Sequence, residues 1–112
     1  MTTLQYEQNC SIMRFVGLFS GKWVLPIVYH LIEAKHPVRF SQLQKALAPI
    51  PQKELSKHLK LLEQHQLITK QIYPEVPPRV EYQITELGQT LQSAIQSLGS
   101  WMELYEKNIN EK

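Results

Sequence analysis

The chain has 112 residues, of which 43% are apolar and 20% charged, and its formal net charge is +2. This length and composition predict one globular domain with a single core, and they exclude a chain that is disordered throughout. No apolar run reaches the roughly 18 residues that cross a bilayer, and the N-terminal residues do not have the basic and apolar segments of a secretory signal. Cys10 is the one cysteine of the sequence, so no internal disulfide can form. We therefore expect a cytoplasmic protein.

The charge is distributed unevenly along the sequence. Residues 35–79 carry eight basic and three acidic side chains (8 − 3 = +5), whereas residues 80–112 carry two basic and five acidic ones (2 − 5 = −3). A basic middle segment is typical of a surface that meets phosphates. Solvated helices produce the same asymmetry, so charge alone leaves both interpretations open.

Two helices are expected before residue 35. Apolar residues recur at helical spacing within residues 4–19, which predicts a first helix there. Ser20 is a candidate N-cap for a second helix over residues 21–34. Pro26 falls in the first two turns of that helix, where a missing N–H costs least.

The next elements resemble a helix-turn-helix. A very short strand is expected at Arg39–Phe40. Ser41 and Gln44 have the spacing of a capping box, so a short helix should begin at Ser41. A proline-bearing turn follows, and a second helix is expected over residues 52–66.

The second helix of this pair divides into two faces. Leu55, Leu59 and Leu62 lie at i, i+4 and i+7 and should point to the core. The outer face carries Lys53, Ser56, Lys57, Lys60 and Gln64, with Gln52 at the N-terminal end. Lysine and glutamine side chains suit phosphates and base edges in a major groove, although any surface helix also shows a polar outer face.

Two strands, residues 67–73 and 79–85, are expected after the second helix. They flank a loop that contains three of the seven prolines of the chain. The prolines limit the flexibility of this loop, which favours a preformed binding element. Arg79 at its foot could contact DNA, or it could pair with Glu75 or Glu81.

A last long amphipathic helix is expected over residues 86–109, with Thr85 as its cap. Its apolar stripe is too long for a domain of this size to cover, which favours a partner chain. Packing on its own domain is the alternative.

With these segments in view, the chain resembles the HxlR family of winged helix-turn-helix regulators, relatives of the MarR type. The resemblance rests on "GKW" at residues 21–23, "RFSQLQKAL" at 39–47, "LSKHLKLLEQHQLI" at 55–68 and "YPEVPPRVEYQITELG" at 73–88. It implies a mostly helical α+β fold, with one domain over residues 1–112, a DNA-binding core over 21–85, and dimerisation helices over 4–19 and 86–109.

The resemblance also implies a homodimeric, DNA-binding transcriptional regulator on a palindromic operator. Separately, we expect no cofactor and no membrane contact. The expected DNA-contacting residues are Ser41, Gln42, Gln52, Lys53, Ser56, Lys57, Lys60 and Arg79. The expected dimer contacts are Ile12, Phe15, Phe19, Leu91, Ile95, Leu98, Trp101, Met102 and Tyr105.

A signal input is also implied. Cys10 occupies a position where some relatives carry an oxidant- or electrophile-sensing cysteine, and a small-molecule effector is the other expected input. A buried structural cysteine is the alternative for Cys10, because a reactive thiol needs exposure and a lowered pKa.

No catalytic or metal-binding constellation is visible, since the chain lacks aspartate and its histidines show no ligand spacing. We therefore do not expect an enzyme. A winged-helix module that binds protein or a small ligand remains open as the alternative function.

Overall fold

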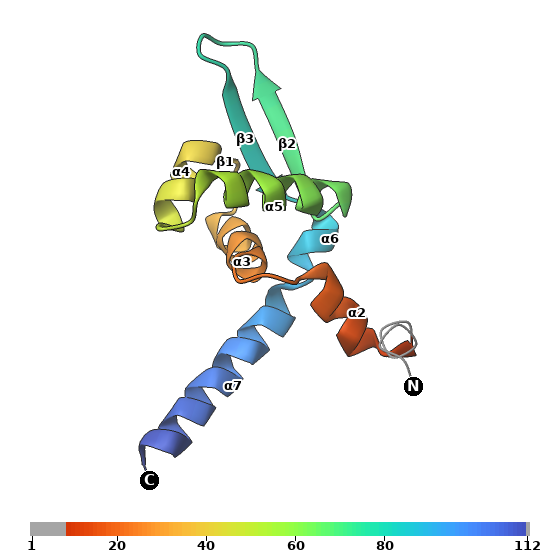
Figure 1. Ribbon diagram of the computed structural model, residues 1–112, viewed down its shortest axis with the longest axis vertical. Coiled ribbons are helices and arrows are strands. Elements are labelled where there is room, and N and C mark those ends of the chain that lie inside the picture. The colour runs from red at the N-terminus through yellow and green to blue at the C-terminus, as the bar shows by residue number, and fades with distance from the viewer. Residues whose placement is uncertain (1–8, 112) are drawn as a thin grey trace.

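The computed structural model describes residues 9–111. The elements in chain order are α2 (Ser11–Leu18), α3 (Val24–Ala34), β1 (Val38–Arg39), α4 (Phe40–Ala46), α5 (Gln52–Gln64), β2 (Ile68–Tyr73), β3 (Arg79–Ile84), α6 (Glu86–Gln89) and α7 (Gln92–Asn110). The strands form an antiparallel sheet in the order β1-β3-β2. The β2–β3 hairpin, the wing, projects beyond α4 and α5 (Figure 1). The mostly helical winged helix-turn-helix fold is thus confirmed.

The N-terminal helices have other bounds than the sequence pattern predicts. Within the described residues the expected first helix is interrupted at Cys10, whose backbone is extended (φ −110°, ψ 117°), and α2 begins at Ser11; residues 4–8 of the expected helix lie outside the described residues. The prediction that Ser20 caps the next helix is wrong, because Gly21 adopts a left-handed φ of 103° and turns the chain before α3 starts at Val24. Pro26 is the third residue of α3, where its missing N–H breaks no helical hydrogen bond.

A single apolar core joins α3, α4, α5 and the base of the sheet. The most deeply buried large side chains are Ile27, Val28, Leu31, Ile32, Leu43, Leu55, Leu59, Leu62 and Ile68. The predicted inner face of α5 is confirmed by the three leucines among them. Full burial of one such side chain stabilises the fold by about 1.5–3 kcal/mol.

Helix α4 begins one residue earlier than predicted. The Oε1 atom of Gln42 accepts a hydrogen bond from the Arg39 N–H at 3.1 Å, so the capping interaction lies at Arg39 and Gln42 and not at Ser41 and Gln44. The cause is β1, in which Val38 and Arg39 pair with Tyr82 and Glu81 of β3. This pairing holds the chain extended up to Arg39, and the helix starts directly after it.

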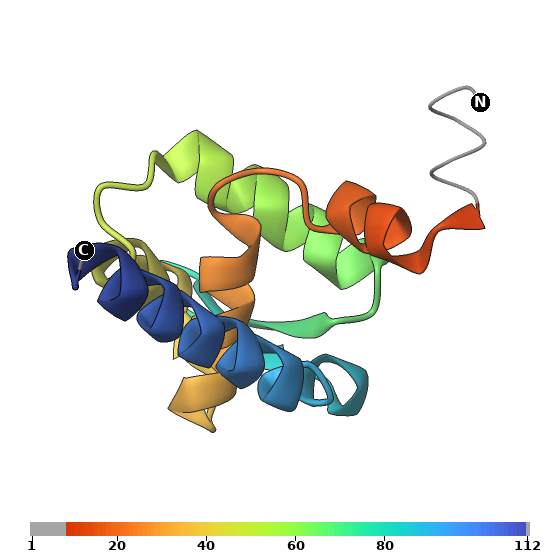
Figure 2. The same cartoon turned by 90° about the horizontal axis from the view of Figure 1, so that it is seen from below.

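The expected single C-terminal helix is divided in two. Thr85 caps α6 as predicted, since its Oγ1 accepts from the Gly88 N–H at 3.0 Å. The Thr90 hydroxyl donates to the Leu87 carbonyl, which favours a turn over continuous helix. Helix α7 packs near Ile95 against the core, then extends away from the rest of the chain, and it contains no buried residue (Figures 1 and 2).

Gly88 lets α6 approach the loop between α5 and β2. A Cβ atom at this position would lie 2.6 Å from Ile84 Cδ1 and closer still to the Leu67 carbonyl oxygen. The Thr85 hydroxyl reaches the same loop and lies 2.9 Å from the Gln66 carbonyl oxygen. Thr85 and Gly88 therefore fix α6 against the C-terminal end of α5.

Candidate nucleic-acid interface

Helix α5 presents the polar face that its sequence predicts. The side chains on this face are all exposed: Gln52, Lys53, Ser56, Lys57, Lys60 and Gln64. The three lysines make no ion pair with any residue that the structure describes. Pro51 precedes the helix and supplies no side-chain cap, so the first N–H groups of α5 can donate hydrogen bonds to an anion.

His58 on the same helix belongs to the core. Its side chain is buried, its Nε2 atom lies 3.3 Å from a Glu54 carboxylate oxygen, and Nδ1 has no hydrogen-bond partner among the described residues. The ring packs beneath the α2–α3 turn, where a Cβ on Gly21 would lie 3.4 Å from His58 Cε1. His65 is exposed at the end of α5, and within residues 9–111 no three potential ligands gather as a metal ion requires.

Arg79, expected at the DNA, is held inside the wing. Its guanidinium lies 2.9 Å from a Glu75 carboxylate oxygen and 3.1 Å from one of Glu81. It also covers the Tyr73 ring at 4.0 Å, and only 28% of its side chain is exposed. The ion-pair alternative for Arg79 is therefore the one the structure shows.

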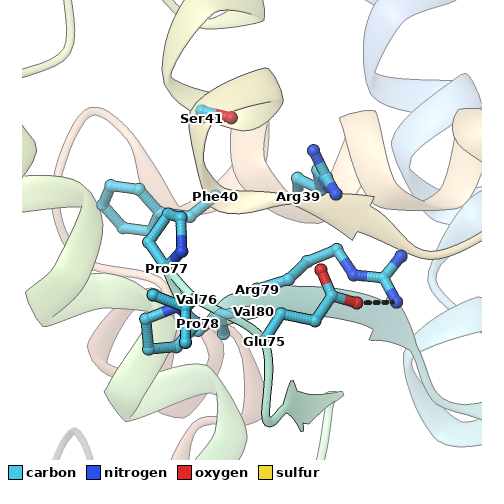
Figure 3. A pocket seen from close by; sticks show the side chains of 9 residues that line it. All are labelled: Arg39, Phe40, Ser41, Glu75, Val76, Pro77, Pro78, Arg79 and Val80. Atoms are coloured by element: carbon cyan, nitrogen blue, oxygen red, sulfur yellow. Dashed lines mark ion pairs between the residues drawn. The ribbon is translucent and has the colours of Figure 1, made fainter.

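The tip of the wing is apolar. Val76 is fully exposed between Glu75 and Pro77, and the Glu75 carboxylate is paired with Arg79, the cation nearest in sequence. A groove of about 520 Å³ separates this tip from the start of α4, and Arg39 and Ser41 line its other side (Figure 3). Ser41 and Gln42 are exposed as expected, although the Gln42 amide oxygen is engaged in the α4 cap.

Arg39 is exposed on this groove and was missed by the reasoning from sequence, which treated it only as part of a strand. The signal that could have found it is its position directly before the first helix of the helix-turn-helix pair. First-helix termini in such pairs lie against the DNA backbone.

The expected dimer contacts fall into three environments. Ile12, Leu98, Trp101, Met102 and Tyr105 are exposed. Phe15, Leu91 and Ile95 are partly buried against the core of their own chain. Phe19 is only 8% exposed and belongs to that core, so little of its side chain is available to a partner.

These features define a winged helix-turn-helix protein with a cationic second helix. No helix within the described residues combines the length and apolar character that spanning a bilayer requires. The model of the HxlR-like helix-turn-helix family matches residues 18–110, and the chain belongs to this family.

Similar proteins support the same assignment. The chain is 35% identical over 104 residues to the uncharacterised HTH-type transcriptional regulator YdeP of Bacillus subtilis, covering 93% of this chain and 80% of YdeP. A crystal structure from Porphyromonas gingivalis W83, assigned to the MarR family of transcriptional regulators, matches with a TM-score of 0.78 and 34% identity, covering 86% of this chain and 92% of the other. The reduced form of the redox regulator HypR matches with a TM-score of 0.80 and 27% identity, covering 92% of this chain and all of HypR.

Proposed function

We propose that this member of the family is a cytoplasmic, homodimeric regulator that binds a palindromic operator, with α5 as the recognition helix. The observation that carries the proposal is the division of α5 into buried leucines and an exposed, unpaired lysine face. Lysines neutralise phosphates, and Gln52 at the N-terminal end suits the adenine edge in a major groove. Two such helices in successive major grooves would lie about 34 Å apart.

The unpartnered side of α7 supports the dimer. Trp101 and Tyr105 stack on each other at 5.4 Å, yet Trp101 is 59% exposed. Leu98, Met102 and Ile109 continue the same stripe and are also exposed. A second copy of the chain would remove this apolar surface from water.

The dimer is tested by Trp101→Glu, which places a charge in the centre of the stripe. Lys107→Gln is the matched control, because Lys107 lies on the opposite side of α7 from the stripe. Sedimentation should give a dimer for the wild type and for Lys107→Gln, and a monomer for Trp101→Glu. A monomeric wild type would contradict the proposal.

DNA binding is tested with duplexes from the upstream region of the gene and with random duplexes. Lys57→Ala should weaken both by roughly 3–10-fold and reduce the slope of log affinity against log salt by about 1.8, because each of the two subunits loses one phosphate contact worth about 0.9. Gln52→Ala should mainly relax base preference, by about 1–3 kcal/mol of discrimination. Equal effects of both substitutions on both duplexes would refute this division of roles.

The signal input is proposed on two features. Cys10 is half-buried directly before α2, and the structural neighbour HypR is a redox regulator. If Cys10 is the sensor, Cys10→Ser should remain on DNA when a quinone releases the wild type. If Cys10→Ser is released like the wild type, sensing by this thiol is excluded.

A small-molecule effector is the other candidate input. An open groove of about 780 Å³ lies between α3 and α7, lined by Leu25, Tyr29, Leu98 and Glu103 among others. This volume lies in the usual range of ligand sites, and the mixture of apolar walls with a hydroxyl and a carboxylate suits a small aromatic compound. A groove that binds such a compound without any change in DNA affinity would favour the alternative function, a ligand-binding module.

A further inference from the structure

We propose that the groove between α4 and the wing holds the DNA backbone, with Arg39 as its phosphate contact and Arg79 as an internal brace of the wing. This inference rests on the proposed function. It assigns the flanking contact to a different residue from the one that the sequence pattern favours.

The Arg79 side chain is already paired with residues of its own hairpin. Its Nη2 and Nη1 atoms pair with Glu75 at 2.9 Å and Glu81 at 3.1 Å, and its face covers Tyr73. The formal charges of Arg79, Glu75 and Glu81 sum to −1. A phosphate approaching Arg79 would therefore meet net negative charge and would have to displace a carboxylate. The same contacts tie the proline loop to both strands, which is what a brace requires.

Arg39 has the opposite environment. It lies where β1 ends and α4 begins, its side chain is exposed, and it makes no ion pair with any residue in the described part of the chain. Its cross-strand neighbour is Glu81, but the Oε2 atom of that carboxylate is taken by Arg79. A guanidinium with unused donors suits a phosphate, which it can bind through two parallel N–H bonds.

The two walls of the groove match the two chemical parts of a DNA strand. Arg39 and the Ser41 hydroxyl line the α4 side, and Val76 and Pro77 line the wing side together with Glu75, whose carboxylate is paired with Arg79 (Figure 3). A sugar–phosphate backbone alternates an anion with an apolar sugar surface. The cationic wall would hold the phosphate, while the apolar wing tip would pack on the adjacent sugars at the minor-groove edge.

Salt dependence of duplex binding separates the two arginines. Arg39→Gln should lower affinity by roughly 3–10-fold on specific and random duplexes and reduce the salt slope by about 1.8, or about 0.9 for each subunit of the dimer, whereas Arg39→Lys should keep the slope. The Glu75→Gln/Arg79→Gln double variant removes one charge of each sign, and it should leave the slope unchanged. Lys107→Gln, far from the groove on α7, is the control for the loss of one surface charge.

A second measurement does not depend on slopes. Duplexes in which single flanking phosphates are replaced by neutral methylphosphonates should reveal one phosphate whose loss weakens the wild type. Arg39→Gln should be insensitive to that replacement, because the two changes remove the same contact. Arg79→Gln should remain sensitive to it.

The possible failures are distinguishable. Suppose that Lys57→Ala reduces the salt slope while Arg39→Gln changes it no more than Lys107→Gln does. The assignment of Arg39 to the DNA backbone is then wrong, and the proposed function stands. If the double variant reduces the salt slope by about 1.8, Arg79 is the phosphate contact of each subunit and its role as a brace is wrong. If the wild type binds no duplex, both the inference and the proposed function fail.

Discussion

Replacement of Gly88 by alanine tests the junction between α6 and the end of α5. The new methyl group would lie 2.6 Å from Ile84 Cδ1 and closer to the Leu67 carbonyl oxygen. The Ile84 side chain can rotate away, but the carbonyl belongs to the backbone, so α6 itself must shift. Forced overpacking of this kind costs about 1–3 kcal/mol.

The shift of α6 would also stretch the Thr85 cap. The Gly88 N–H donates to Thr85 Oγ1 at 3.0 Å, and loss of a helix cap costs about 1 kcal/mol. We therefore expect Gly88→Ala to lower the free energy of unfolding by about 2–4 kcal/mol. Urea unfolding followed by circular dichroism measures this, at one protein concentration because a dimer couples stability to concentration.

Gly17→Ala is the matched control, since Gly17 lies within α2 and nothing stands within 4 Å of its would-be Cβ. An exposed helical glycine gains up to about 1 kcal/mol when replaced by alanine. If Gly88→Ala is as stable as the wild type, or gains stability as Gly17→Ala should, the close-approach reasoning is refuted.

Three further outcomes are expected. Burial, and then the Glu63 carboxylate, raises the pKa of Tyr82 above 10.0, so the folded state holds this proton more tightly than the unfolded state does. The stability from this group is present below pH 10 and is lost as pH rises through the raised pKa; the Tyr82→Phe variant should lack this alkaline loss in pH-dependent unfolding. Thr85→Ala should lower the unfolding free energy by about 1 kcal/mol in urea, whereas Thr85→Ser should stay near the wild type. Leu59→Ala should cost about 2–5 kcal/mol by the same assay, because the site is 1% exposed, and a loss below about 1 kcal/mol would contradict its core position.

The sequence predicts the parts of this fold that local pattern controls. The leucine face of α5 and the Thr85 cap follow from spacing alone, and the structure confirms both. The start of α4 does not follow, because Ser41 and Gln44 have a capping pattern that is overridden by β1 pairing with a strand more than forty residues away.

The wing shows a second limit of reasoning from sequence. From the sequence, an arginine after a proline loop fits DNA binding equally well whether its guanidinium is free or already paired with carboxylates of its own chain. Only the folded hairpin brings Glu75 and Glu81 to the same guanidinium. Likewise, the exposure of Arg39 depends on how the short strand β1 meets α4, and the spacing of apolar residues in the sequence does not predict this junction.

The ion pairs of Arg79 beside the wing loop have a kinetic consequence. Long-range attraction to a polyanion comes from cations without partners, and on this chain those include the three lysines of α5 and Arg39. A duplex encounter would therefore be oriented by α5, with an association rate that falls steeply with ionic strength. The proline-stiffened tip at Val76 has no unpaired cation within the described residues 74–79 and would act after the encounter, by prolonging the residence time of the complex rather than by hastening its formation.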